Sequence, residues 1–337
     1  IIPVKGATQS ILCDTQRGDY RVIPNDLYDL LSHYDGCTFK EILVAYGKEN
    51  KEIIEEYVDS LYKEECIFFC DTEEEVNCFP TLDMTFELPS TISNAIIDVD
   101  RNSKHDYKQI IQQLSELGCE NLEIRVFEPI PLSTYEHIFA SWKSSILEYV
   151  ILICPYNESL SLEAYENMMM KHQRIAKIVV HSCEERIVEE KSELTKDVSI
   201  FYTTQIINNA QCCGHISTSY FNPDLRFITE AIHFNTCLNQ KISIDQRGNI
   251  KNCPAMSSSF GKMGEDSLIE VSSLTSFQKY WKINKDQIKV CRDCEFRYIC
   301  QDCRAILTEP NDIYSKPLKC SYNPYKAKWE KESLSKG

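Results

Sequence analysis

The sequence lacks three features, and each absence argues against one class of protein. Positive charge is not in excess: the 337 residues carry a net charge of −15 and the pI is near 5.0. Nucleic-acid-binding proteins normally present a basic surface, so this balance argues against such a partner. No apolar run approaches the roughly 20 residues of a membrane-spanning helix. The opening residues, IIPVKGATQS, lack the basic start and the long apolar stretch of a secretory signal, and no initiating methionine is present. We therefore expect a cytoplasmic protein with no membrane partner.

Cysteine, in contrast, is abundant, with 17 residues in the chain. Ten are scattered through the first 236 residues and seven lie in residues 237–337. A secreted disulfide scaffold would be shorter and would spread its cysteines evenly. We expect most of the scattered cysteines to be small buried residues with free thiols.

The seven C-terminal cysteines follow the spacing of metal-binding motifs. Two of them bracket a two-strand pattern with a turn at Gly248, four form a C-x2-C-x5-C-x2-C run, and one follows alone. Paired cysteines two residues apart are typical of metal knuckles. Five residues between the pairs is short compared with the ~12–20 that link two knuckles around one zinc, so we expect two interleaved sites. The seven residues are Cys237, Cys253, Cys291, Cys294, Cys300, Cys303 and Cys320.

Residues 1–85 predict a small module with the element order of a winged helix. A capping box at Thr38 and Glu41 begins one of its helices, which ends before Gly47. The module is acidic, which argues against DNA as its ligand. The predicted elements are strands at Ile11–Cys13 and Tyr20–Ile23, helices at Asp26–Ser32, 38–46 and 53–62, and a closing strand at Cys66–Phe69.

Residues 90–210 alternate between strand and helix patterns, after a charged linker at 71–76. Repeated βα units imply an α/β region with a parallel sheet, either open or curled into a partial barrel. The predicted strands are Ala95–Val99, Leu122–Phe127, Tyr149–Cys154, Ile178–His181 and Val198–Tyr202. The predicted helices are Tyr107–Leu117, Tyr135–Leu147 and Leu162–His172.

This order of parts, with the cysteine pattern in residues 211–337, resembles a radical S-adenosylmethionine (SAM) enzyme that carries a C-terminal SPASM domain. The phrases CLNQKISID, GNIKNCP and KDQIKVCRDCEFRYICQDCRA are similar to the maturase of the grasp-with-spasm peptide systems. The resemblance implies maturation of a ribosomal precursor peptide together with an ATP-grasp ligase. It also implies that the N-terminal module recognises the leader part of that peptide.

Two departures from the family argue against SAM cleavage. Radical-SAM enzymes carry C-x3-C-x2-C after the first strand, whereas residues 100–106 here contain no cysteine. The family's Gly-Gly-Glu-Pro after the second strand is replaced by Val126, Phe127, Glu128 and Pro129. A Cβ and an aromatic ring then take the space that the ligand would need. We expect no SAM to bind.

The resemblance also implies a ligand assignment for two auxiliary [4Fe–4S] clusters, with two structural zinc sites as the alternative because thiolates suit both metals. The first site is one ligand short, and Cys213 is the preferred fourth ligand, ahead of Cys212 and His215. The first cluster would be held by Cys237, Cys253 and Cys303, and the second by Cys291, Cys294, Cys300 and Cys320.

For the leader peptide, the resemblance implies that an extended segment adds as a strand to the edge at Asp19–Ile23. The peptide-contacting residues would be Tyr20, Arg21 and Val22 on that edge and Tyr57 and Leu61 on the third helix. The alternative is a purely structural N-terminal cap.

No catalytic residue can be assigned from the sequence. Asp98, Asp100 and Arg101 lie where barrel enzymes place their chemistry, although a solvated loop is the commoner explanation for such a trio. Three functions stay open: an iron–sulfur peptide maturation protein, a non-catalytic precursor-recognition scaffold with structural zinc, and an iron–sulfur electron-transfer partner.

Overall fold

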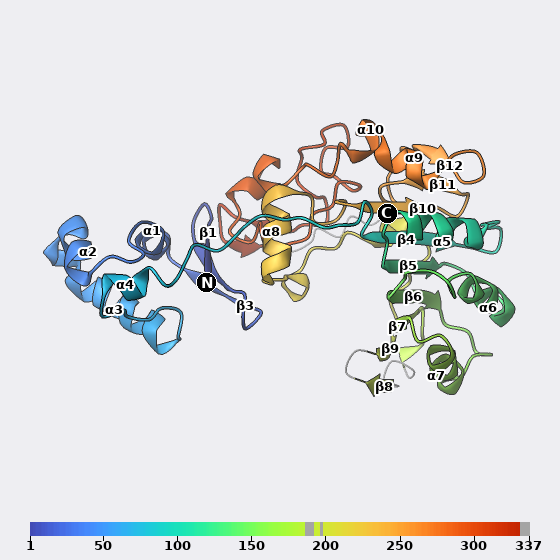
Figure 1. Cartoon of the computed structure of the whole chain (residues 1–337), viewed down its shortest axis with the longest axis horizontal. Helices are drawn as coiled ribbons and strands as arrows, with labels where there is room; N and C mark the ends of the chain where they lie inside the picture. The colour runs from blue at the N-terminus through green and yellow to red at the C-terminus, as the bar shows by residue number, and fades with distance from the viewer. Residues whose placement is uncertain (186–191, 196–197, 331–337) are drawn as a thin grey trace.

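The computed structural model of the chain describes residues 1–185, 192–195 and 198–330. A small N-terminal lobe lies at one end of an elongated molecule and a large sheet lies at the other (Figure 1). The C-terminal segment, residues 279–330, lies between them and above the sheet in this view. No helix in the described ranges is long and apolar enough to cross a membrane.

The N-terminal lobe, defined here as residues 2–63, is a three-stranded antiparallel sheet with three helices. The sheet order is β1-β2-β3, so β3 pairs with β2 alone among the described strands. The capping box at Thr38 is confirmed. The predicted strand at Cys66–Phe69 is wrong, because these residues pair with no strand, and β1 was not predicted. The elements are β1 (Ile2–Lys5), β2 (Ser10–Asp14), β3 (Asp19–Ile23), α1 (Asn25–His33), α2 (Phe39–Tyr46) and α3 (Lys51–Lys63).

The central strand β2 is buried on both of its faces. Because side chains alternate along a strand, Ile11 and Cys13 point to one face and Leu12 points to the other. Leu12 packs with Leu61 in the core shared with α1 and α3. Ile11 and Cys13 pack against Phe296 and other residues of the C-terminal segment. The small sheet therefore joins its own helices to the cysteine-rich part of the chain.

A nine-stranded mixed sheet forms the large part of the molecule, in the order β12-β11-β10-β4-β5-β6-β7-β9-β8. Its six central strands run parallel, and antiparallel strands complete both edges. All five strands predicted in this region are confirmed. The parallel strands are β4 (Asn94–Val99), β5 (Asn121–Val126), β6 (Tyr149–Pro155), β7 (Ile175–His181), β9 (Val198–Tyr202) and β10 (Lys241–Ile244). The edge strands are β8 (Ser192–Thr195), β11 (Asn249–Lys251) and β12 (Gly261–Lys262).

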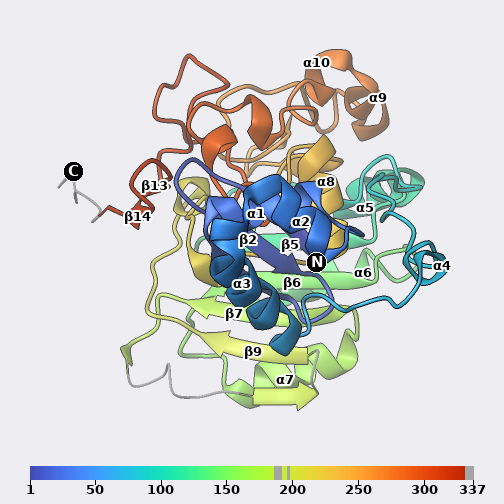
Figure 2. The same ribbon diagram turned by 90° about the vertical axis from the view of Figure 1, so that its left-hand side faces the viewer.

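Helices cover one face of this sheet. Ile97, Ile124 and Leu152 point to that face and are fully buried in the main apolar core. The helices lie on the side of the sheet that is turned away from the N-terminal lobe, and the view along the long axis shows the lobe in front of the opposite face (Figure 2). The covering helices are α5 (Tyr107–Glu116), α6 (Leu132–Ala140), α7 (Leu162–Lys171) and α9 (Leu268–Ser273). α6 is shorter than predicted, since turns replace the helix after residue 140.

The cysteine-rich segment, residues 237–320, is continuous with the sheet. Its strand β10 pairs in parallel with β4, so the sheet extends past the predicted boundary at residue 210. Residues 279–330, in contrast, contain no α-helix and no strand longer than two residues. The remaining elements are α4 (Glu73–Val76), α8 (Leu225–His233), α10 (Thr275–Gln278), β13 (Tyr322–Asn323) and β14 (Lys328–Trp329).

Candidate metal centre

The structure brings the eight predicted ligand cysteines together in two groups. In the first group, burial raises the pKa of the Cys237 thiol to about 11, and the charges of Cys213 and Cys303 also act on it. Burial raises the pKa of Cys253 to about 12, with a further contribution from Cys237. The first group consists of Cys213, Cys237, Cys253 and Cys303.

Cys213 reaches the first group through a tight turn. Gly214, with φ +84°, follows it, and a Cβ on this glycine would lie 3.1 Å from the Cys303 Sγ. This close approach favours glycine at position 214. The other two candidates point elsewhere: the Cys212 Sγ donates to the Ile206 carbonyl, and the His215 ring lies against Tyr220.

The second group forms around the C-x2-C-x5-C run. Burial raises the pKa of the Cys291 thiol to about 12, and Cys300 and Cys320 lie near enough to contribute. Burial also raises the pKa of Cys294 well above its ordinary value, with a smaller contribution from Cys300. The second group consists of Cys291, Cys294, Cys300 and Cys320.

A buried polar network fixes the chain segment that carries Cys237 relative to the segment that carries Cys303. The Asn235 Oδ1 accepts from the Cys237 backbone N–H at 3.1 Å, and its Nδ2 donates to the Asp302 Oδ2 at 2.6 Å. Asp302 is also paired with Arg304 at 2.7 Å, and both side chains are buried. Because Asp302 precedes Cys303, this network fixes the turn at Cys237 relative to the C-terminal loop.

Each group has a lysine at one of its sulfurs. The Lys285 Nζ lies 2.9 Å from the Cys300 Sγ, and Lys285 is only 5% exposed. The partly buried Lys241 places its Nζ 3.9 Å from the Cys237 Sγ. Neither ammonium has a carboxylate within 4.0 Å among the described residues. A buried cation needs a nearby anion, and metal-bound thiolates supply one, so the donor set fits an anionic metal–thiolate group.

Within each group the thiols interact, but they do not form the donor arrangement of a single bound ion. In residues 1–185, 192–195 and 198–330, no group of three or more His, Cys, Asp or Glu side chains is arranged so that it could hold a metal ion. A tetrahedral zinc site with Zn–S distances of ~2.3 Å would require sulfurs roughly 4 Å apart.

The raised thiol pKa values predict a pH dependence of metal retention. A ligating thiol must release its proton, so each unit fall in pH weakens binding by up to about tenfold per thiol. Because the pKa values reach about 11 for Cys237 and about 12 for Cys253 and Cys291, this dependence extends across the whole neutral range. We expect the metal-loaded protein to lose metal to a chelator at pH 6 and to retain it at pH 8. Equal retention at both pH values would contradict this assignment.

The predicted trio at the end of β4 does not form a site. Asp98 is fully buried and accepts two hydrogen bonds from Arg125, at 2.7 and 2.9 Å. Arg101 is exposed and pairs with Glu128 at 3.4 Å. Asp100 accepts from the Asn102 backbone N–H within its own turn. The solvated-loop interpretation therefore fits Asp100 and Arg101 but is wrong for Asp98, which is buried in β4 and paired with Arg125.

The predicted peptide-contacting residues have different environments. Val22 is 52% exposed on β3, and the exposed Arg21 pairs with Glu64 of α3's C-terminal end. Tyr57 is partly buried beside the lobe core. Leu61 is 4% exposed and belongs to that core, so it has little surface left for a peptide.

Tyr20 lies on β3, but its ring faces the C-terminal segment. It packs edge-on against Phe296, with 5.6 Å between the ring centroids, and also against Phe221. This tyrosine therefore holds the edge strand in place, and the exposed residues of the strand are Asp19, Arg21 and Val22.

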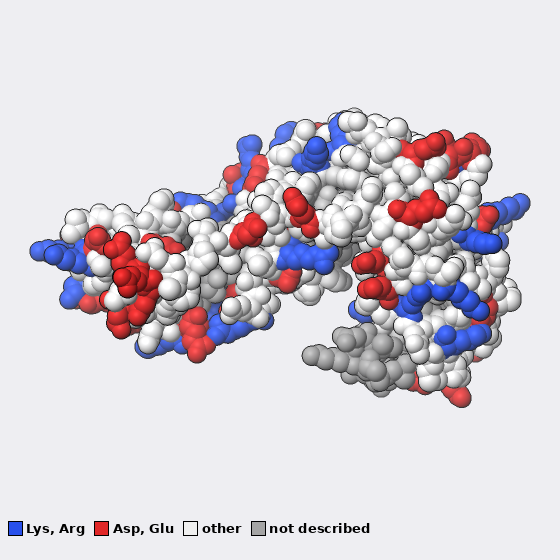
Figure 3. All heavy atoms as spheres, viewed as in Figure 1, with Lys and Arg blue, Asp and Glu red and all other residues white. Residues whose placement is uncertain are grey.

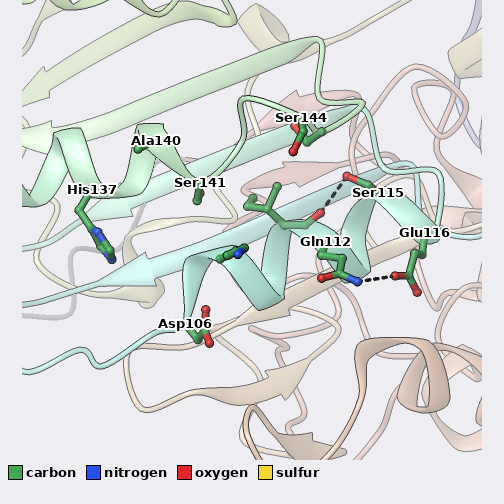
Figure 4. Close-up of a pocket in the computed structure, with 11 residues that line it drawn as sticks. Asp106, Gln112, Ser115, Glu116, His137, Ala140, Ser141 and Ser144 are labelled. Carbon is green, nitrogen blue, oxygen red and sulfur yellow. Dashed lines mark hydrogen bonds between the residues drawn. The ribbon is translucent and has the colours of Figure 1, made fainter.

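Two concavities lie away from the thiols. An open groove of about 660 Å³ runs between α5 and α6 (Figure 4). Its polar side chains bond to their own helices: the Ser115 Oγ donates to the Ile111 carbonyl, and Gln112 donates to Glu116. The molecule is also hollowed between the N-terminal lobe and the β7–β9 end of the sheet (Figure 3).

Sequence reasoning missed Asn235, Lys241 and Lys285. Lysine and asparagine are usually exposed, so nothing in composition marks them as buried partners of thiols. Their proximity to the cysteine phrases was the available signal, since Lys241 follows Cys237 by four residues. A comparison of the chain with known family models and with curated proteins gave no match.

Proposed function

We propose that this chain is a cytoplasmic protein that matures a ribosomal peptide with a partner ATP-grasp ligase. It binds the precursor by its leader and carries two auxiliary [4Fe–4S] clusters in a SPASM-like domain. Residues 1–85 act as a winged-helix leader-recognition module, and residues 90–210, extended by β10, β11 and β12, form a degenerate, partial radical-SAM-like barrel. The observation that carries the proposal is the division of eight cysteines into two groups of four, each with a lysine at one sulfur.

Two groups of four thiols match the ligand number of two four-iron clusters. In the described residues, no group of three or more His, Cys, Asp or Glu side chains is arranged to hold a single metal ion. A cluster of four irons and four sulfides holds its ligands further apart than one ion does, because the inorganic core lies between them. Its net negative charge also suits a buried ammonium such as that of Lys285.

The residues where SAM would bind support a role without SAM cleavage. The buried Asp98–Arg125 pair lies on the face of the sheet that points away from the covering helices. The loop after β4 is closed by the Ser103 hydroxyl, which donates to the Gln246 carbonyl at 3.0 Å. Phe127 is buried beside Arg125. The contacts that these side chains make at the ends of β4 and β5 support a role without SAM cleavage.

The edge of β3 is the proposed site for the leader. β3 pairs with β2 on one side only, and on its other side it has no strand partner among the described residues. The backbone groups on that open side can pair with an added strand. Val22 exposes an apolar side chain there, and Tyr57 of α3 lies partly buried in the lobe core. Carboxylates gather on the α3–α4 side of the lobe (Figure 3), which suits a leader with basic residues.

Val22→Glu is expected to weaken binding of the precursor peptide encoded with the protein by at least about tenfold, or about 1.4 kcal/mol. The substitution puts a charge on the apolar part of the edge and leaves the lobe core unchanged. Val44→Glu is the matched control, because Val44 is 78% exposed on α2 and should bind as the wild type does. Fluorescence anisotropy with a labelled precursor measures both. Equal affinity of the Val22→Glu and Val44→Glu variants would remove the edge from the proposal.

A further inference from the structure

Lys285 is placed to act on the second thiol group. It lies in a short 3-10 turn, Lys285–Gln287, and only 5% of the residue is exposed. Its Nζ donates to the Cys300 Sγ at 2.9 Å and to the Gln301 carbonyl at 2.8 Å. Both acceptors belong to the loop that carries the group, so the ammonium is fixed at one ligand sulfur.

The carboxylates near Lys285 are already paired with other cations. Asp302 is bound by Arg304 at 2.7 Å. Asp286, next to Lys285 in sequence, accepts from Arg297 at 2.9 Å and from the Tyr298 hydroxyl. The ammonium of Lys285 therefore has the Cys300 sulfur as its charged partner. The other acceptor at hydrogen-bond distance is the neutral carbonyl of Gln301.

We propose that Lys285 is a tuning residue that raises the reduction potential of the cluster held by Cys291, Cys294, Cys300 and Cys320. The inference rests on the proposed function only in that it takes this group to be a [4Fe–4S] cluster. Reduction adds one electron to a cluster that is already anionic. A cation hydrogen-bonded to a ligand sulfur stabilises the reduced form more than the oxidised form, because attraction grows with the charge on the cluster.

Lys241 provides an internal comparison at the first group. Its Nζ is 3.9 Å from the Cys237 Sγ, a full ångström further than the corresponding distance at Lys285, and it is partly rather than fully buried. Charge interactions weaken with distance and with solvent screening. Removal of Lys241 should therefore shift the first cluster's potential less than removal of Lys285 shifts the second's.

The test is an anaerobic redox titration of the full-length, cluster-loaded protein, followed by visible absorbance and electron paramagnetic resonance. The variants are Lys285→Met, Lys285→Arg and Lys241→Met, and the signal missing from Cys291→Ser identifies the second cluster. We expect Lys285→Met to lower the midpoint potential of the second cluster and leave the first unchanged. Lys285→Arg should restore it, and Lys241→Met should give a smaller shift at the first cluster.

The outcomes separate this inference from the function on which it rests. An unshifted potential in Lys285→Met with full iron content would overturn the tuning role. Equal loss of iron in Lys285→Met and Lys285→Arg would also overturn it, because the lysine would then be needed for assembly and its charge would not be the relevant property. Absence of any cluster signal in the wild-type protein would instead contradict the proposed function.

Discussion

Replacing Cys300 with serine is expected to loosen the N-terminal lobe, although the lobe lies more than 200 residues earlier in the sequence. The reason is that the second thiol group is the surface on which the lobe packs. Residues 279–330 have almost no regular secondary structure to hold them, so we propose that their order depends on a metal bound by the second thiol group. Loss of one ligand should therefore disorder both the loop and the face of β2 that packs on it.

The contacts between the lobe and the second group are direct. The Ala7 backbone N–H donates to the Asp293 carbonyl at 2.8 Å, and the Gln9 Nε2 donates to the Glu295 Oε1 at 2.7 Å. Both acceptors are neighbours of Cys294. A shared apolar cluster adds Ile11 and Cys13 from β2 together with Phe296, Ile299, Cys300 and Tyr322.

Hydrogen–deuterium exchange of β1 and β2 in the metal-loaded protein measures this effect. We expect the protection of these strands to fall by at least about tenfold in Cys300→Ser, equivalent to about 1.4 kcal/mol of local stability. Cys183→Ser is the matched control: Cys183 is 7% exposed against 6% for Cys300, but it lies outside both groups. Equal protection in the two variants would show that the lobe packs independently of the metal site.

Arg125→Met is expected to lower the free energy of unfolding by about 3–5 kcal/mol, because it leaves a buried carboxylate without its partner. Asp98 is 0% exposed and Arg125 5%, and the guanidinium makes two hydrogen bonds to the carboxylate. Even with this partner, burial raises the pKa of Asp98 to about 6. In Arg125→Met, the negative charge that remains on Asp98 would thus be strongly disfavoured in the folded state.

The double variant Asp98→Leu/Arg125→Met removes both charges and should recover most of the lost stability. Arg101→Met is the control, since its side chain is 64% exposed and its pair with Glu128 should contribute at most about 1 kcal/mol. Urea denaturation measures all three. A loss in Arg125→Met no larger than that in Arg101→Met would contradict the structural role of the pair.

The strands of the large sheet could be predicted because short β-branched runs such as those at Ile96 and Val179 are bounded by turns, a local signal. The pairing of β10 with β4 could not, because it joins residues about 150 positions apart and no spacing rule encodes it. The predicted strand at Cys66–Phe69 had the right composition but no partner strand. β-propensity describes packing on a sheet, so it fails where no sheet is present.

The candidate site also combines features that local sequence patterns predict with features that depend on long-range packing. Cysteine spacing is local, and it predicted two interleaved sites, whereas the division of the thiols between those sites came from the family resemblance. The position of Tyr20 could not be read from the sequence, because its ring turns toward Phe296 across the interface between the lobe and the C-terminal segment. Leu61 has the helical spacing expected of a residue that lines an apolar groove. In the structure it is buried in the apolar core of the lobe instead.

The most direct test of the central claim is an analysis of iron, sulfide and zinc in the anaerobically reconstituted protein, with its visible absorbance. The account predicts about eight irons and about eight sulfides per chain, in two four-iron clusters, with the charge-transfer absorbance of thiolate-bound iron. It also predicts no cleavage of added SAM. Stoichiometric zinc without that absorbance would contradict the cluster assignment for both thiol groups.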